Sequence, residues 1–268
     1  MNSYNKLLNS ITKNNSILCV GLDSDISKMP VHFEKNIYGL FDFNQTVIEQ
    51  TKDFAATYKI NFAFYEQYGS DGFGLIKQTL DLIPQNIFTV ADAKRGDIGN
   101  TSSAYAKSVF DFFSFDSITV NPYMGFDSIA PFLEDKSKFV FLLALTSNKG
   151  SNDFQRLISD GKPIYQHIIE KTVKKFPKEN IGFVIGATHP KELFDLRKII
   201  PENAILIPGV GTQGGDIRAI KEANNKSLAL INVSRAIIYP EIVDNDFAKS
   251  VHNIAKKYRN DFNNFSTC

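Results

Sequence analysis

Two carboxylates and a lysine follow a run of apolar residues, 87–90, that has the composition of a buried β-strand. The residues after this run read Asp92-Ala-Lys-Arg-Gly-Asp97. Side chains alternate between the two faces of an extended chain, so Asp92 and Lys94 are expected on one face and Asp97 in the turn beyond. Opposite charges on one face of a buried strand end are costly to bury. The spacing therefore predicts a catalytic site at this strand end.

Polar residues also follow the neighbouring apolar runs: Asp23, Lys59, Asn121, Thr146 and Ser147. Lysine and aspartate alternate at adjacent strand ends, so an array without net charge can form from Lys59, Asp92, Lys94 and Asp97. A lysine flanked by carboxylates stays protonated and can donate a proton. A set of structural salt bridges is the alternative, but it would need no third and fourth member, so the array favours catalysis.

A glycine-rich segment indicates where an anion binds. Residues 208–215 read Pro-Gly-Val-Gly-Thr-Gln-Gly-Gly after the seventh apolar run, and Arg235 follows the eighth. Glycines let backbone N–H groups approach a phosphate, the next helix would present its amino terminus, and an arginine can bind two phosphate oxygens. The loops after strands seven and eight are the usual phosphate site of a (β/α)8 enzyme. These residues therefore predict a phosphate site.

The composition is that of a soluble globular protein. Its 268 residues are 43% apolar and carry a formal charge of +1, so no global field favours nucleic acid or an acidic membrane. Cys19 and Cys268 have no nearby partner, and no apolar run reaches the roughly 20 residues of a membrane span. With a polar amino terminus that lacks a signal peptide, the chain is expected in the cytoplasm. The histidines, at 32, 167, 189 and 252, lack metal-ligand spacing and are expected at the surface or on helices.

Eight short apolar runs alternate with segments of helical periodicity. The runs are 17–22, 57–64, 87–93, 117–121, 139–145, 181–187, 204–209 and 228–233, and helices are expected at 72–82, 101–113, 165–176, 190–199 and 215–223. Runs that are apolar throughout predict parallel strands covered on both faces, and eight such units predict a closed (β/α)8 TIM barrel. A doubly wound open sheet is the alternative, but no G-x-G-x-x-G follows the first run.

No internal repeat or linker interrupts the chain, so residues 1–268 are predicted to form a single barrel domain. Amphipathic helices at 4–13 and 246–262 are expected to close the barrel floor and complete the outer ring. Two connections are long. Residues 24–45 follow the first strand, and residues 148–163 follow the fifth and are expected to form a mobile lid.

Together these motifs resemble those of the orotidine 5′-phosphate decarboxylase family. The resemblance rests on Asp-x-Lys-x-x-Asp at 92–97, Lys59 on the preceding strand, the segment 208–215 and Arg235. The length of the chain and Asn-Pro-Tyr-Met-Gly at 121–125 resemble the longer bacterial and protozoan branch. The resemblance implies a carboxy-lyase that converts orotidine 5′-phosphate to UMP and CO₂ in de novo pyrimidine biosynthesis, with no cofactor and no metal.

The resemblance also implies catalytic roles. Lys94 would protonate C6 of the pyrimidine, Asp92 would lie beside the departing carboxylate, and Lys59 would orient Asp92 and touch the ribose. Asp97, with Ile98 and Thr101, would reach into the neighbouring subunit's site. The two sites of a homodimer would therefore be shared between its subunits.

The implied substrate contacts cover the whole nucleotide. They are Asp23 and Asn61 for the ribose, Asn121, Thr146, Ser147 and Pro208 for the pyrimidine, and Gln213, Gly214, Gly215, Ser234 and Arg235 for the phosphate. The sequence leaves open which of Thr146 and Ser147 faces the base. Ser234 departs from the glycine that is frequent in the family, and its hydroxyl would add a contact.

Two other functions remain open. A metal-dependent sugar-phosphate decarboxylase or aldolase-like relative can share the Asp-x-Lys-x-x-Asp pattern and would bind Mg²⁺ through carboxylates. A catalytically silent nucleotide-binding barrel is the other, although the lysine at position 94 argues against it. Activity that a chelator abolishes would favour the first, and tight UMP binding without turnover would favour the second.

Overall fold

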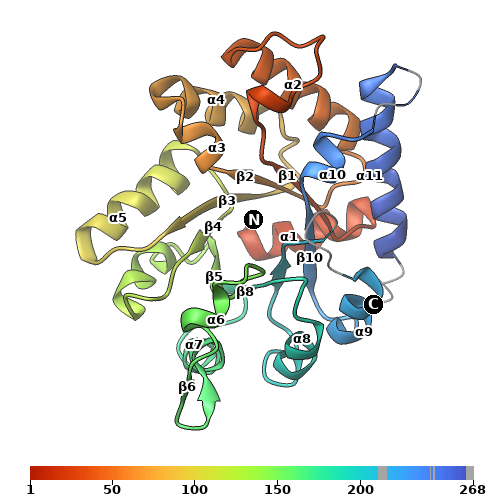
Figure 1. Ribbon diagram of the computed structural model, residues 1–268. Coiled ribbons are helices and arrows are strands. Elements are labelled where there is room, and N and C mark those ends of the chain that lie inside the picture. The colour runs from red at the N-terminus through yellow and green to blue at the C-terminus, as the bar shows by residue number, and fades with distance from the viewer. Residues whose placement is uncertain (211–215, 242, 244, 264–268) are drawn as a thin grey trace.

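Eight parallel strands close into a barrel in the computed structural model, which describes residues 1–210, 216–241, 243 and 245–263 (Figure 1). Around the barrel the order is β1, β10, β9, β8, β5, β4, β3 and β2. Their bounds are β1 Leu18–Leu22, β2 Thr57–Asn61, β3 Phe88–Arg95, β4 Ser117–Val120, β5 Phe139–Leu145, β8 Ile181–Ile185, β9 Ile205–Ile207 and β10 Ala229–Val233. Each predicted run forms one of these strands, so the predicted TIM barrel is confirmed and the open sheet is not found.

Helices surround the strands (Figure 1). The longer ones are α1 Ser3–Asn14, α2 Ile37–Thr51, α4 Gly69–Leu82, α5 Gly99–Lys107, α7 Ile164–Val173, α8 Pro190–Arg197, α9 Ile217–Asn224 and α11 Phe247–Asn263. The short ones are α3 Ala63–Glu66, α6 Ser151–Phe154, α10 Arg235–Ile238, the 3-10 turns η1 Ile26–Lys28, η3 Phe126–Ser128 and η4 Ala130–Leu133, and the π-helical turn η2 Ser108–Phe112. None of the described helices is long and apolar enough to cross a membrane.

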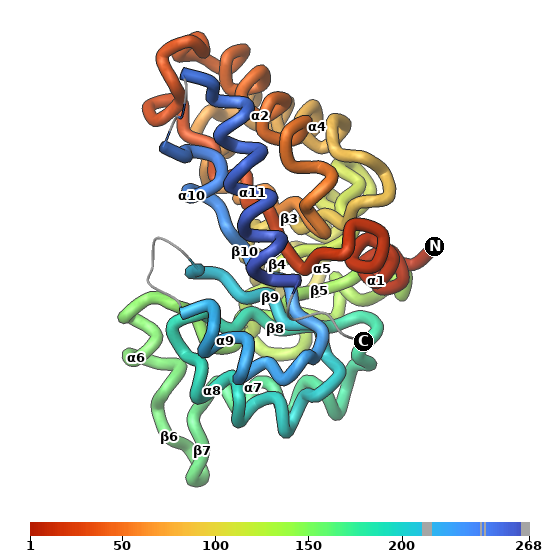
Figure 2. Tube along the Cα trace, turned by 90° about the vertical axis from the view of Figure 1, so that its right-hand side faces the viewer, coloured from red at the N-terminus to blue at the C-terminus, as the bar shows by residue number. Residues whose placement is uncertain are grey.

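Apolar side chains fill the amino-terminal end of the barrel. Cys19, Phe88 and Phe139 belong to one buried cluster there, and Leu7 of α1 is completely buried in it. Helix α1 therefore covers the barrel floor, at the end opposite to α6 (Figure 2). Helix α11 lies in the outer ring beside α2 and α10. With its floor covered, the barrel presents its carboxyl-terminal end for a site.

The connection 24–45 is more regular than the sequence predicts. Helix α2 begins within it, because the Asn36 side chain accepts a hydrogen bond from the Gly39 backbone N–H at 2.9 Å and caps the helix. Gly39 packs against the preceding turn, where an added Cβ would lie 2.0 Å from the carbonyl oxygen of Glu34. The sequence predicts a long connection here without naming a helix in it, because a single capping asparagine in a polar segment is a weak signal.

The predicted lid, residues 148–163, contains helix α6 and a two-stranded hairpin, β6 Ile158–Ser159 and β7 Lys162–Pro163. The hairpin turn uses Asp160 and Gly161, both with positive φ, of 47° and 75°. The hairpin projects from the body of the barrel (Figure 2). Movement of this segment stays a prediction.

A buried arginine connects three segments of the outer layer. Arg197 of α8 is 5% exposed, and its guanidinium donates to Asn224 Oδ1 through Nε at 2.8 Å and through Nη2 at 2.6 Å. It also donates to the backbone carbonyls of Ile200, Asn203 and Leu228, at 3.1, 2.8 and 2.7 Å. Burial lowers the pKa of Arg197 to about 9, and each of these acceptors is neutral.

Replacing Arg197 with lysine should destabilise the fold, because an ammonium cannot bond all these acceptors at once. We expect the free energy of unfolding to fall by about 3 kcal/mol, measured by urea denaturation. The matched control is Arg218→Lys on α9, since the Arg218 side chain is 87% exposed and, among the described residues, pairs with Glu222 in its own helix. Equal urea midpoints for the two variants would contradict a structural role for Arg197.

Candidate active site

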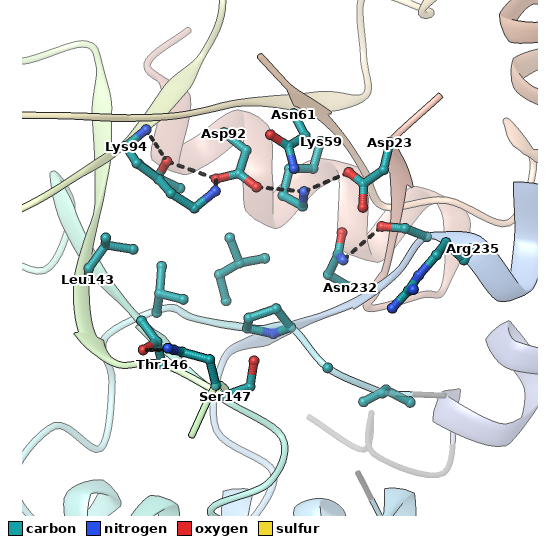
Figure 3. Close-up of a pocket in the computed structure, with 18 of the residues that line it drawn as sticks. Asp23, Lys59, Asn61, Asp92, Lys94, Leu143, Thr146, Ser147, Asn232 and Arg235 are labelled. Atoms are coloured by element: carbon teal, nitrogen blue, oxygen red, sulfur yellow. Dashed lines mark hydrogen bonds and ion pairs between the residues drawn. The ribbon is translucent and has the colours of Figure 1, made fainter. Parts of the chain in front are cut away.

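A cavity of about 420 Å³ opens at the carboxyl ends of the barrel strands (Figure 3). The predicted residues among its lining are Asp23, Lys59, Asn61, Asp92, Lys94, Thr146, Ser147, Pro208, Ser234 and Arg235. Strand register explains part of this grouping, because Gly21 pairs with Lys59 and Asn61 pairs with Asp92. This register places the charged side chains of β2 and β3, and Asp23 directly after β1, along one wall.

The charged side chains form a chain of ion pairs along this wall (Figure 3). Lys59 Nζ lies 2.7 Å from Asp92 Oδ2 and 3.4 Å from Asp23 Oδ1. Lys94 Nζ lies 2.5 Å from the other carboxylate oxygen of Asp92. Within one chain the order is thus Asp23, Lys59, Asp92 and Lys94. Asp23 takes the fourth place in the array that was predicted for Asp97, because β1 pairs with β2 and Asp23 directly follows β1.

Burial and pairing fix the charge state of the two inner members. Burial alone would lower the pKa of Lys59, but Asp23 and Asp92 outweigh it and raise that pKa above its ordinary value. Burial alone would raise the pKa of Asp92, but Lys59 and Lys94 outweigh it and hold that pKa well below its ordinary value. Lys59 is therefore a permanent cation and Asp92 a permanent anion at neutral pH. The Lys94 side chain is 50% exposed, so its ammonium can contact a ligand.

Four predicted residues lie outside the cavity of this chain. The Asp97 carboxylate accepts a hydrogen bond from the backbone N–H of Ile98 at 2.8 Å, and Ile98 is 51% exposed. Thr101 is exposed on α5. The Asn121 side chain accepts from the Tyr123 backbone N–H at 3.0 Å and so shapes the turn after β4.

The end of the cavity away from Lys94 is where the sequence predicts phosphate, and Arg235 lies there (Figure 3). Gln213, Gly214 and Gly215 of the predicted phosphate set fall outside the described residues. Ser234 precedes Arg235, and its hydroxyl accepts a hydrogen bond from Asn232 Nδ2 at 3.2 Å. Ser234 lies directly against β1, since a Cβ added to Gly21 would lie 1.9 Å from Ser234 Oγ. Glycine at position 21 therefore makes room for the serine.

Replacing Gly21 with alanine should displace Ser234 and weaken binding at this end of the cavity. We expect KM to rise about 10-fold, the effect of a moderate overpacking strain, measured by steady-state kinetics. The double variant Gly21→Ala/Ser234→Gly should recover most of the loss, because it removes the clashing hydroxyl. Gly74→Ala is the control, since nothing lies within 4 Å of an added Cβ there. A double variant no better than Gly21→Ala would contradict this explanation.

Several lining residues were missed by the sequence analysis. Leu143, Val184 and Leu206 form an apolar floor, and Thr119 and Asn232 add polar groups. The Asn232 side chain also accepts from Cys19 Sγ at 3.5 Å, below the charged wall. Burial raises the pKa of Cys19 to about 12, so this thiol stays protonated. Alternation along the strands is the one signal that could have found these residues, because they face inward.

The segment 148–163 contacts the cavity wall. Gln155 Oε1 accepts from the Thr146 backbone N–H at 2.8 Å, and Gln155 Nε2 donates to Thr146 Oγ1 at 2.9 Å. Arg156 lies 2.6 Å from Glu192 and 3.0 Å from Nδ1 of His189. The other ring nitrogen of His189 lies 3.0 Å from the carbonyl oxygen of Thr146. These contacts hold Thr146 in place, and the sequence did not distinguish this histidine from the other three.

Comparison with known proteins matches this geometry to one family. The model of the orotidine 5′-phosphate decarboxylase / HUMPS family matches residues 16–241. An orotidine 5′-phosphate decarboxylase of Herpetosiphon aurantiacus is 44% identical over 249 residues, 92% of each chain, and one of Dehalococcoides mccartyi is 42% identical over 272 residues, 99% of this chain and 98% of the relative. The solved structure of Leishmania donovani OMP decarboxylase superposes with a TM-score of 0.87 at 34% identity, covering 99% of this chain and 98% of the other.

Proposed function

The chain belongs to the orotidine 5′-phosphate decarboxylase family, and we infer that it converts orotidine 5′-phosphate to UMP and CO₂ in de novo pyrimidine biosynthesis. The observation that supports this function most directly is the alternating array of Asp23, Lys59, Asp92 and Lys94 in the cavity. The reaction is that of a carboxy-lyase. Its mechanism follows from what the bond cleavage at C6 demands.

Loss of CO₂ from C6 leaves an electron pair in the plane of the pyrimidine ring, where the π system cannot absorb it. Stabilisation of this charge must be electrostatic and must be in place before the bond breaks. We propose that the Lys94 ammonium supplies it and then donates its proton to C6. Asp92 holds Lys94 Nζ at 2.5 Å and is itself held by Lys59, so the ammonium is positioned without substrate.

Asp92 is proposed to lie beside the substrate carboxylate. Its charge is fixed by Lys59 and Lys94 on either side, so it cannot relieve repulsion by taking up a proton. CO₂ departs as a neutral molecule, so the negative charge moves from the carboxylate beside Asp92 to C6, next to the Lys94 ammonium. The same Asp92 that orients the proton donor would therefore also favour cleavage.

Separate regions of the cavity are proposed to bind the pyrimidine, the ribose and the phosphate of the nucleotide. The apolar floor of Leu143, Val184 and Leu206 suits the flat pyrimidine ring, bordered by Thr146, Ser147 and Pro208. Asp23, Lys59 and Asn61 would bind ribose hydroxyls. Arg235, with Ser234 and the predicted Gln213, Gly214 and Gly215, would bind the phosphate. Phosphate binding energy, remote from C6, can then be used to hold the reacting groups in place.

We further propose a homodimer in which Asp97, Ile98 and Thr101 complete the partner's site. Large apolar side chains are exposed along α5 and η2 and in the turn after β4, which supports a covered surface there. They are Ile98 at 51%, Tyr105 at 36%, Phe112 at 64%, Tyr123 at 88% and Met124 at 49% exposed. Asn121 lies in the same turn after β4 as Tyr123 and Met124. The chain is also proposed to be one domain and to act in the cytoplasm.

The proposed reaction is tested by incubating the purified protein with orotidine 5′-phosphate and following the loss of substrate ultraviolet absorbance. We expect full activity after treatment with EDTA. A metal-dependent sugar-phosphate reaction is the second candidate, because such enzymes can share the Asp-x-Lys-x-x-Asp pattern of residues 92–97. Activity that EDTA abolishes and Mg²⁺ restores would support that candidate and contradict the first.

A further inference from the structure

We propose that Thr119 is a positioning residue for the decarboxylation, holding both the Asp92 carboxylate and the backbone of Lys94 through one buried hydroxyl. This inference rests on the proposed function of the cavity. Thr119 lies on β4, is 1% exposed and lines the cavity. Its role is separate from the ion pairs, since it carries no charge and lies across from them on the next strand.

The Thr119 hydroxyl makes two hydrogen bonds to the array. Oγ1 lies 3.0 Å from the backbone nitrogen of Lys94 and 3.0 Å from Asp92 Oδ1. A backbone N–H can only donate, so Oγ1 accepts from Lys94 and its single proton goes to the carboxylate of Asp92. The hydroxyl thus accepts one hydrogen bond and donates one, and its two partners are the residues proposed to act at C6.

The pairing of β3 with β4 explains why this hydroxyl is needed. Val90 pairs with Ser117 and Ala91 with Ile118, and the next pair is Arg95 with Val120. The β3 strand therefore bulges, with residues 92–94 opposite the single position of Thr119. A bulge leaves backbone groups without their regular strand partner and can redirect a side chain near a site. The Thr119 side chain provides a bonding partner for the Lys94 N–H within the bulge.

Lys94 also has an unusual backbone conformation. Its φ is +48°, in the left-handed region that side chains other than glycine rarely adopt. Such a conformation persists only when surrounding contacts hold it. The hydrogen bond from Lys94 N–H to Thr119 Oγ1 is one such contact, and the ion pair with Asp92 is the other. Together they set where the Lys94 ammonium points.

Replacing Thr119 with valine tests this role, because valine has nearly the same shape and lacks both hydrogen bonds. We expect kcat to fall by about 10²-fold, the effect of a small misplacement of a reacting group, while KM changes little. Phosphate and ribose contacts lie elsewhere in the cavity. Thr119→Ser keeps the hydroxyl and should restore most of kcat, which a purely steric role would not predict.

The control is Ser117→Ala, which removes another buried hydroxyl from β4. Ser117 Oγ donates to the Thr89 carbonyl at 3.0 Å, away from the array. It should lower the urea midpoint without lowering kcat. If Thr119→Val does not fold, Thr119→Ala is compared with Thr119→Ser in the same way. The role of Thr119 would be overturned by an alanine or valine variant as fast as wild type, or by a serine variant as slow as the valine variant; the proposed function would still stand. Wild-type protein that is inactive on orotidine 5′-phosphate would overturn both the proposed function and the role of Thr119.

Discussion

Replacing Lys94 with alanine is expected to lower kcat by at least about 10⁴-fold, because one group supplies both electrostatic stabilisation and the proton. Asp92 keeps its ion pair with Lys59 in this variant, so the wall of the cavity stays formed. KM should change far less than kcat, since the proposed phosphate and ribose contacts remain. The Lys94 side chain is half exposed, so the variant should still fold, and a urea denaturation curve checks this because Asp92 loses one of its two cations.

The measurement is loss of substrate absorbance at high enzyme concentration, with substrate well above KM. Lys77→Ala is the matched control, because Lys77 is an exposed lysine on α4 whose ion pair within the described part of the chain is with Asp81, at 3.8 Å. A Lys94→Ala variant with raised KM and normal kcat would show that Lys94 only binds substrate. That result would remove the proton donor from the proposed mechanism.

Mixing Lys94→Ala chains with Asp97→Ala chains is expected to restore activity that neither homodimer has. Asp97 lies outside the cavity of its own chain, and the proposal places it in the partner's site. In a mixed dimer one site then receives both wild-type groups. Random exchange of subunits should recover about a quarter of the wild-type sites in a two-fold symmetric dimer.

A second mixture provides the control for this experiment. Lys94 and Asp92 contact each other within one chain, so a mixture of Lys94→Ala and Asp92→Ala chains contains no intact site. It should stay inactive even though dimers form. If heterodimers are demonstrated and the Lys94/Asp97 mixture is equally inactive, Asp97 does not act across the subunit boundary.

The barrel could be predicted because its strands are covered on both faces and therefore read as continuous apolar runs. Strands β1, β8 and β10 are buried at each position. Helix α2 was not predicted, because its start depends on the Asn36 cap within a polar segment. Apolar patterning thus locates buried elements and gives less information about where helices begin.

The site was predictable to the extent that charges are conspicuous after apolar runs. Lys59, Asp92 and Lys94 meet in the cavity for that reason. Alternation could have placed Thr119 on the inward face of its strand, but its role could not be recognised, because its position opposite the β3 bulge depends on register. The contact of Asp23 with Lys59 likewise depends on register, here the pairing of β1 with β2 that sets Gly21 opposite Lys59.

The most direct test is to supply wild-type, EDTA-treated protein with orotidine 5′-phosphate labelled in its carboxyl carbon. Labelled CO₂ and UMP are then measured over many turnovers. The proposed metal-free decarboxylation predicts one labelled CO₂ for each UMP formed, at a rate that EDTA does not change. Binding of the nucleotide without release of labelled CO₂ would contradict the proposed reaction.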